Sequence, residues 1–147
     1  MARLPRYRFP EEGVYHVTVR GTGPIAIFRD DHDRFALLTR LAEVIPRQHW
    51  VCHVYCLMTT HYHLVVGSKL VDLSAGMHRL NGLYAQRFNR RHGRSGHLLQ
   101  GRFGLRVIEE GDYFESACNY VVENPVRAGI CKHPAEWPWG GIGERLV

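Results

Sequence analysis

The sequence lacks the features that mark membrane and secreted proteins. No stretch approaches 18 consecutive apolar residues, and residues 1–6 contain no apolar segment of signal-peptide type. The four cysteines form neither a Cys-x-x-Cys pair nor the dense disulfide framework of a small secreted fold. We therefore expect a cytoplasmic protein without a membrane segment.

Repeats, low-complexity tracts and linkers are also missing from the sequence. The chain has 147 residues, of which 45% are hydrophobic and 22% are charged, as in ordinary globular proteins. This length is enough for one domain to bury a core of its own. We expect a single domain over residues 1–147.

Acidic residues are absent between Leu73 and Ile108, although the whole chain has 14 of them. Arginines give this segment all of its formal positive charge. Arginine binds phosphate groups through two hydrogen bonds and stacks on bases, so nucleic acid is the expected partner. A solvated helix surface is the alternative. The candidate DNA-binding residues are Arg79, Arg87, Arg90, Arg91, Arg94, Arg102 and Arg106.

Hydrophobic periodicity predicts the first half of the fold. Residues 14–19 alternate as in a strand, and residues 30–47 have the spacing of a helix whose N-cap is Asp30 or Asp31. Residues 50–58 form a second strand. Thr59 and Thr60 connect it in a hairpin to a third strand that begins at His61.

A second helix, a fourth strand and a last helix are predicted after the hairpin. Asp72 or Ser74 can cap the second helix and Gly93 can end it, with a ridge of arginines beside its apolar stripe. Residues 102–107 alternate as a strand, and the last helix ends near Asn124 because Pro125 follows. The fold class is α+β, a ferredoxin-like (βαββαβ) antiparallel sheet with helices on one face. A C-terminal helix that carries the candidate catalytic residue follows.

Two histidines, His61 and His63, stand two apart in the third predicted strand. Residues i and i+2 of a strand share a face, so both imidazoles can form half of a divalent-metal site. Cys52 and Cys56 are close in sequence. A structural zinc site is nevertheless disfavoured, because a His-x-His pair lacks the usual spacing of zinc ligands.

Tyr120 and Asn124 are four apart on the last predicted helix, at the edge of its apolar stripe. A phenol can attack a phosphodiester when a metal ion polarises the phosphate. Two imidazoles and one amide oxygen would bind Mg²⁺ or Mn²⁺ and leave positions for phosphate oxygens. Tyr120 is thus the candidate nucleophile, with Tyr84 second, and His61, His63 and Asn124 are candidate metal ligands. Considered alone, Tyr120 fits better as a hydrogen-bonded tyrosine at the edge of the core.

Six motifs occur in order and cover nearly the whole chain. They are Tyr15-His-Val-Thr-Val-Arg-Gly, Cys56-Leu-Met-Thr-Thr-His-Tyr-His-Leu-Val-Val, Tyr84-Ala-Gln-Arg-Phe-Asn-Arg-Arg-His-Gly, Gly96-His-Leu-Leu-Gln-Gly-Arg-Phe, Asn119-Tyr-Val-Val-Glu-Asn-Pro-Val-Arg-Ala-Gly and Glu136-Trp-Pro-Trp. Together they resemble the single-tyrosine HUH transposases, and within them the REP-associated tyrosine transposases. The chain departs from the family at Thr59 and Thr60, where Pro-Asn is frequent, and at Tyr62, where an aliphatic residue is usual.

The resemblance implies an enzyme that nicks and rejoins single-stranded DNA at hairpins or repeats. Tyr120 would attack a phosphodiester, leaving a 5′-phosphotyrosine link and a free 3′-hydroxyl, and a 3′-hydroxyl would later reseal the strand. His61 and His63 would be the paired metal ligands, and Asn124 the third, a position that is glutamine in many relatives. The implied protein is bacterial, cytoplasmic and nucleoid-associated, with a homodimer as one allowed assembly.

Three other interpretations stay open from the sequence. The same order of elements describes RNA-recognition motifs, which bind nucleic acid without catalysis. A phosphoesterase with two His-x-Thr or His-x-Ser motifs would need a second such motif beside His16-Val-Thr18. A domesticated host protein that acts on repeated palindromes would share the sequence features of a mobile element's transposase.

Overall fold

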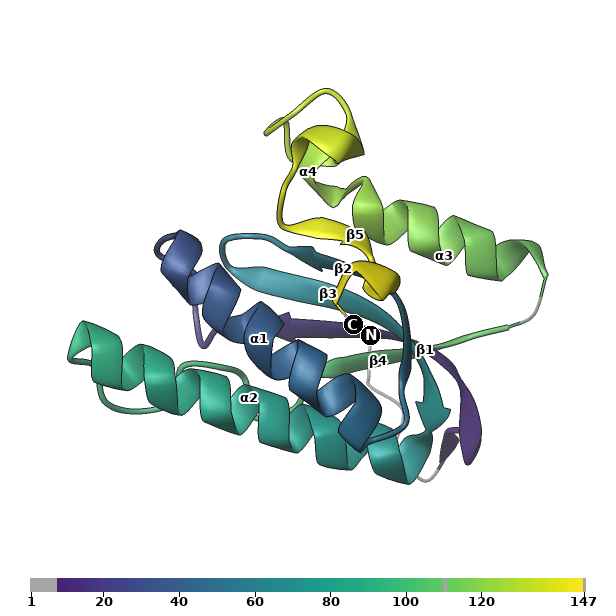
Figure 1. The fold of residues 1–147 in the computed structure, drawn as a ribbon, viewed down its shortest axis with the longest axis horizontal. Coiled ribbons are helices and arrows are strands. Elements are labelled where there is room, and N and C mark those ends of the chain that lie inside the picture. The colour runs from purple at the N-terminus through teal and green to yellow at the C-terminus, as the bar shows by residue number, and fades with distance from the viewer. Residues whose placement is uncertain (1–7, 110, 147) are drawn as a thin grey trace.

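A five-stranded antiparallel sheet forms the centre of the computed structural model, which describes residues 8–109 and 111–146 (Figure 1). The strands lie in the order β4-β1-β3-β2-β5. The first four confirm the predicted ferredoxin-like sheet, whereas β5 was not predicted because three residues are too few to show alternation. The strands are β1 (Glu12–Arg20), β2 (Val51–Leu57), β3 (His61–Lys69), β4 (Gly104–Ile108) and β5 (Gly140–Ile142).

The helices lie on both faces of this sheet (Figure 1). The helices α1 (Asp31–Arg47) and α2 (Leu70–His92) cover one face, as predicted. The C-terminal helix α3 (Asp112–Val122) crosses the opposite face and is followed by the short helix α4 (Asn124–Arg127). Two 3-10 turns, Pro134–Glu136 and Gly143–Leu146, flank β5.

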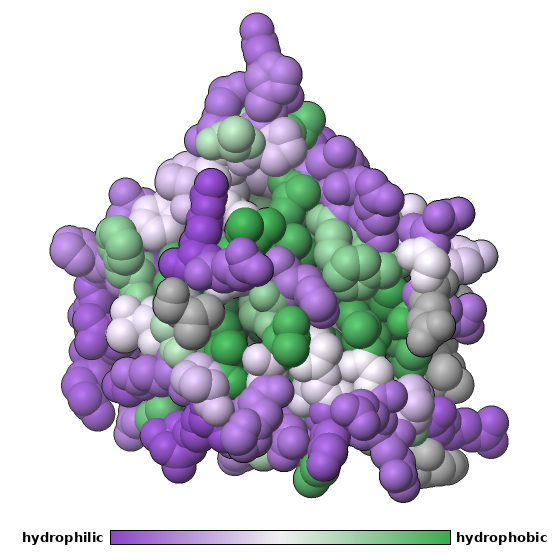
Figure 2. Space-filling model, turned by 45° about the vertical axis from the view of Figure 1, so that its right-hand side comes forward, coloured by the Kyte–Doolittle hydropathy of each residue, from purple (hydrophilic) through white to green (hydrophobic). Residues whose placement is uncertain are grey.

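Alternation along the strands divides the core into two clusters. Tyr62 and Leu64 of β3 belong to the larger cluster, which includes buried residues of α1 and α2. Val65 of β3 belongs to a smaller cluster with Val121 of α3. Apolar side chains gather in the middle of the face seen in Figure 2, with hydrophilic ones around them.

Several predicted ends of elements are confirmed. Asp30 caps α1, its Oδ1 accepting a hydrogen bond from the Asp33 backbone at 3.1 Å. Gly93 ends α2 in the left-handed conformation, with φ 62°. The helix α3 ends at Val122, shortly before Pro125.

Two predicted starts are wrong. Neither Asp72 nor Ser74 caps α2, because β3 runs directly into the helix at Leu70. The backbone N–H of Leu70 instead donates to the carbonyl of Glu11 at 2.7 Å. The strand β4 begins at Gly104, so Arg102 precedes the strand rather than lying on it.

No helix within residues 8–109 and 111–146 combines the length and apolar character needed to cross a bilayer. The expectation about residues 1–6 lies outside the described residues.

Candidate active site

Two histidines of β3 lie side by side on the sheet face that α3 crosses. In the antiparallel pairing with β1, His61 is opposite Arg20 and His63 is opposite Thr18. The centroids of the two imidazole rings are 5.0 Å apart, and the rings are nearly perpendicular, at 88°. Tyr62 points to the other face and is fully buried. The structure therefore places both imidazoles on one face, as strand alternation predicts.

Each imidazole uses its Nδ1 for a contact inside the protein. The Nδ1 of His61 lies 3.1 Å from Oγ1 of Thr60. The Nδ1 of His63 lies 2.9 Å from Nε2 of His16 and 3.2 Å from Oγ1 of Thr18. When these Nδ1 atoms carry the protons, each Nε2 has a lone pair for a ligand, which is the arrangement that supports a metal-binding histidine.

Burial keeps these imidazoles neutral. Burial lowers the pKa of His63 to about 3, and the neighbouring His16 and His61 add to the shift. Burial, with Arg106 nearby, lowers the pKa of His16 to about 4. The pKa of His61 is lowered by burial and by Arg20. Neutral imidazole is the form that binds a metal ion, so the electrostatic setting suits that role.

His16, His61 and His63 form a histidine cluster. Tyr120 lies beside this cluster and belongs to α3 of the same chain. Its ring centroid lies 6.5 Å from that of His63 and 6.1 Å from that of His16, with edge-to-face orientations in both pairs. The side chain is 52% exposed, so a substrate can approach its hydroxyl. The structure thus brings the predicted nucleophile and the predicted histidine pair together within one chain. Tyr84, the second candidate, is buried and donates its hydroxyl to the carbonyl of Ile27.

Asn124 is not on the same helix as Tyr120. The helix α3 ends at Val122, and Asn124 is the first residue of α4. Its Nδ2 is buried and has no hydrogen-bond partner among the described residues. Its role as a third metal ligand stays a prediction.

Three arginines surround the histidine cluster, and only Arg106 was predicted. In the antiparallel register, Arg106 of β4 is opposite His16 of β1, and Arg20 of β1 is opposite His61 of β3. Arg127 of α4 contacts Tyr120 and, with Arg20, contributes to the lowered pKa of His63. Arg20 has a sequence signal, because it is in phase with His16 on β1. Arg127 has none, because its position depends on the break between α3 and α4.

The other predicted arginines lie elsewhere. Arg79, Arg87 and Arg90 are exposed on α2, which covers the sheet face opposite to the histidine cluster. Arg94 follows the end of α2 and bonds to the carbonyls of Gly96 and His97. The ridge predicted on one helix face is therefore shorter than expected.

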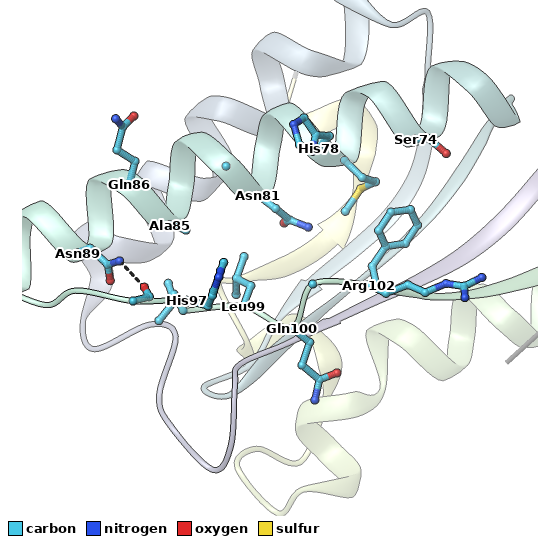
Figure 3. Close-up of a pocket in the computed structure, with 16 residues that line it drawn as sticks. Ser74, His78, Asn81, Ala85, Gln86, Asn89, His97, Leu99, Gln100 and Arg102 are labelled. Carbon is cyan, nitrogen blue, oxygen red and sulfur yellow. Dashed lines mark hydrogen bonds between the residues drawn. The ribbon is translucent and has the colours of Figure 1, made fainter. Parts of the chain in front are cut away.

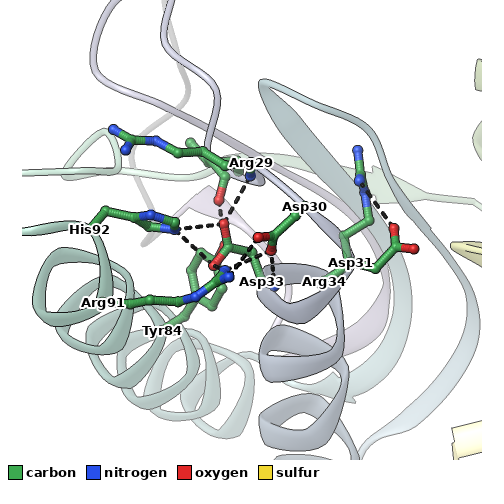
Figure 4. A network of polar contacts seen from close by, with 9 residues as sticks. Arg29, Asp30, Asp31, Asp33, Arg34, Tyr84, Arg91 and His92 are labelled. Carbon is green, nitrogen blue, oxygen red and sulfur yellow. Dashed lines mark hydrogen bonds and ion pairs between the residues drawn. The ribbon is translucent and has the colours of Figure 1, made fainter.

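Arg91 belongs to a polar network that joins α2 to the start of α1 (Figure 4). Its guanidinium pairs with Asp30 at 2.5 Å and with Asp33 at 2.7 Å. Asp33 is only 3% exposed and also bonds to His92 and to the backbone N–H of Arg29. Arg91 belongs to the segment that lacks acidic residues, but the tertiary fold brings Asp30 and Asp33 next to it.

A groove of about 690 Å³ runs between α2 and residues 96–103 (Figure 3). His78, Asn81 and Gln86 line the α2 side, and Arg102 lies on the opposite wall. Asn81 accepts a hydrogen bond of 2.5 Å from the hydroxyl of Tyr62, the residue between the paired histidines. The groove is therefore connected to the histidine strand through one side-chain contact.

The donors at the histidine cluster fit a divalent metal ion. Two neutral imidazoles with an available Nε2 suit Mn²⁺, and Mg²⁺ accepts such ligands when oxygen atoms complete its shell. Within residues 8–109 and 111–146, no group of three or more His, Cys, Asp or Glu side chains could hold a metal. Further ligands would have to come from an amide, the substrate or water.

Comparison with known proteins identifies the family. The sequence profile described as "Transposase IS200 like" matches residues 11–124, so the chain belongs to the family of IS200-like transposases. This confirms the family to which the six motifs pointed. No curated protein sequence matches the chain.

Solved structures confirm the fold. A REP-associated tyrosine transposase bound to a REP hairpin superposes with a TM-score of 0.75 and 18% identity, over 95% of this chain and 82% of that one. A candidate transposase from Deinococcus radiodurans R1 superposes with a TM-score of 0.52 and 14% identity, over 84% of this chain and 97% of that one.

Proposed function

We propose that this chain nicks and rejoins single-stranded DNA at hairpin or repeat sequences through a 5′-phosphotyrosine intermediate. The observation that carries the proposal is that Tyr120 lies beside His63, which in turn lies beside His61, within a single chain. The family supports a transposase-type function on DNA, and a structure of similar fold is bound to a REP hairpin. The enzyme is then a single-tyrosine HUH transposase, a strand transferase of the endonuclease and ligase type.

The proposed reaction is a phosphoryl exchange at Tyr120. The phenolic oxygen forms a bond to phosphorus while the bond from phosphorus to the 3′-oxygen breaks. The phenol loses one proton and the departing 3′-oxygen gains one. The reverse attack by a 3′-hydroxyl restores a DNA phosphodiester, so no external energy source is needed.

His61 and His63 would hold Mg²⁺ or Mn²⁺ through Nε2, with Asn124 proposed as a further ligand. Bound there, the ion would supply positive charge that polarises the phosphate. Arg20 is the strand partner of His61 and Arg106 that of His16, and both arginines would contact phosphate oxygens of the DNA. His16 bonds to His63 and fixes the orientation of that ring.

The arginines of α2 and the groove beside them would bind the flanking DNA. Arg79 and Arg90 are exposed along α2, and Arg102 lies on the far wall of the groove. Phosphate contacts of this kind position a strand without reading its sequence. We propose a cytoplasmic, nucleoid-associated protein, with a homodimer as an assembly that the self-contained site does not require.

The adduct itself tests the proposal. Labelled single-stranded DNA carrying a hairpin, incubated with the protein and Mg²⁺ or Mn²⁺, should give a complex that survives denaturation. Tyr120→Phe should give none, and His61→Ala or His63→Ala should give little while keeping most DNA affinity. Tyr84→Phe is the matched control. An adduct that persists in Tyr120→Phe, or that forms undiminished in EDTA, would refute the mechanism.

A phosphoesterase is the second candidate, favoured by one observation. His16 and Thr18, the His-x-Thr pair of β1, both contact Nδ1 of His63. On β3 the second histidine occupies the position where such an enzyme needs a hydroxyl. Metal-independent hydrolysis without a tyrosine adduct would support this candidate over the first.

A further inference from the structure

The guanidinium of Arg127 lies over the ring of Tyr120. Its central carbon is 3.9 Å from the ring centroid, the separation of a stacked cation and aromatic ring. One of its terminal nitrogens, Nη2, also donates a hydrogen bond to the backbone carbonyl of Tyr120. The same side chain therefore holds both the ring and the backbone of one residue.

This double contact has a cause in the sequence. Pro125 has no N–H, and the chain breaks between α3 and α4 at Glu123. The break lets α4 bring Arg127 back over Tyr120, seven residues earlier, where it caps the Tyr120 carbonyl. A continuous helix would place residues seven apart about two turns from each other along the axis.

Tyr120 otherwise has few restraints. Its side chain is about half exposed, and the rings of His16 and His63 lie 6.1 and 6.5 Å from its centroid in edge-to-face orientations. An exposed tyrosine with two rotatable bonds exchanges rotamers rapidly. A nucleophile must be held close to its attack geometry, and a displacement of about 1 Å can lower a rate about 100-fold.

We infer that Arg127 is a positioning residue that fixes the phenol of Tyr120 beside the histidine pair. This inference rests on the proposed function of Tyr120 as the nucleophile. Arg127 acts through the tyrosine ring and carbonyl, and the planar guanidinium is the feature that allows both contacts. A lysine at this position would keep the positive charge, but its ammonium group is not planar and its N–H donors are not held in a fixed fork.

The test compares Arg127→Ala and Arg127→Lys with the wild type in single-turnover cleavage of the labelled hairpin DNA at saturating protein. Both variants should cleave about 10 to 100-fold more slowly, with DNA affinity within about 3-fold of the wild type. Millimolar guanidinium should partly restore Arg127→Ala, and an equal concentration of sodium should not. Arg40→Ala, which removes a partly exposed arginine of α1 that pairs with Glu43, is the control and should cleave normally.

Three results would overturn the inference. These are a wild-type rate in Arg127→Ala, full activity in Arg127→Lys, or a fall in DNA affinity that accounts for the slower cleavage, because the last two describe a phosphate contact. If Arg127→Ala does not fold, shown by its melting curve, Arg127→Lys decides alone. Failure of the proposed function is separate, because it appears as an adduct that survives Tyr120→Phe.

Discussion

The network around Asp33 makes a prediction about stability that is independent of catalysis. Asp33 is 3% exposed, and it accepts hydrogen bonds from the guanidinium of Arg91 at 2.7 Å and from the backbone of Arg29 at 2.8 Å. His92 lies 2.9 Å from the same carboxylate. Asp33→Asn keeps the shape of the side chain but replaces one accepting oxygen by a donating amide, which faces donors.

Breaking a buried ion pair by removing one partner costs about 3–5 kcal/mol. The present cost is smaller, because the side chain of Arg91 is 33% exposed and can be hydrated again. We therefore expect Asp33→Asn to lower the free energy of unfolding by about 2–3 kcal/mol. For a chain of this size that corresponds to a fall in Tm of about 6–9 °C.

Urea or thermal unfolding of the metal-free protein measures this change. Asp31→Asn is the matched control, because Asp31 is exposed and lies 3.8 Å from Arg34, so its loss should leave Tm unchanged. Arg91→Ala should also destabilise the fold while leaving the salt dependence of DNA binding as it is. An unchanged Tm in Asp33→Asn would refute the stabilising role of the network, and a flatter salt dependence in Arg91→Ala would show that Arg91 contacts DNA.

The remaining predictions concern pH and DNA binding. When the pH falls from 7 to 5, the free energy of unfolding should decrease by about 2 kcal/mol through His63. The reason is that its pKa in the folded protein, about 3, lies below the unfolded value near 6.5, so the unfolded chain binds the proton first. A His63→Gln variant without metal should show a correspondingly weaker loss in unfolding experiments at the two pH values. For single-stranded DNA, Arg87→Ala/Arg90→Ala should flatten the log-log salt dependence of affinity by about 1.4 if both residues contact phosphates, and an unchanged slope would remove α2 from the interface. Arg20→Ala should flatten it by about 0.7 and also slow cleavage, as a salt titration and a single-turnover assay would show together.

The order of elements and the histidine pair could be predicted because both depend on local periodicity. Alternation in the third strand places His61 and His63 on one face whatever the neighbouring elements are. The helical spacing of Val121 with its neighbours likewise predicts that solvent can reach Tyr120, and its side chain is exposed in the structure. These features need no knowledge of tertiary contacts.

The partners of the charged residues could not be predicted in the same way. Arg91 belongs to a segment without acidic residues, yet Asp30 and Asp33 reach it from α1, about 60 positions earlier. A sequence window measures charge along the chain, whereas an ion pair depends on how two helices pack. The role predicted for Arg91 in DNA binding therefore competes with a structural role that only the tertiary fold reveals.

The separation of the α2 arginines from the histidine cluster poses a geometric requirement for any DNA substrate. Residues 98–100 extend along the end of β1, with the N–H of Gln100 bonded to the carbonyl of Arg20 at 2.9 Å and a bridge between Gly21 and Leu99. This segment is one wall of the groove, and the side chain of Gln100 points away from α2 (Figure 3). Because Arg20 is opposite His61, the groove wall and the histidine cluster meet at one corner of the sheet. If the proposed function holds, we expect one DNA strand to pass around this corner from the groove to Tyr120, so that both sets of arginines would serve the same substrate.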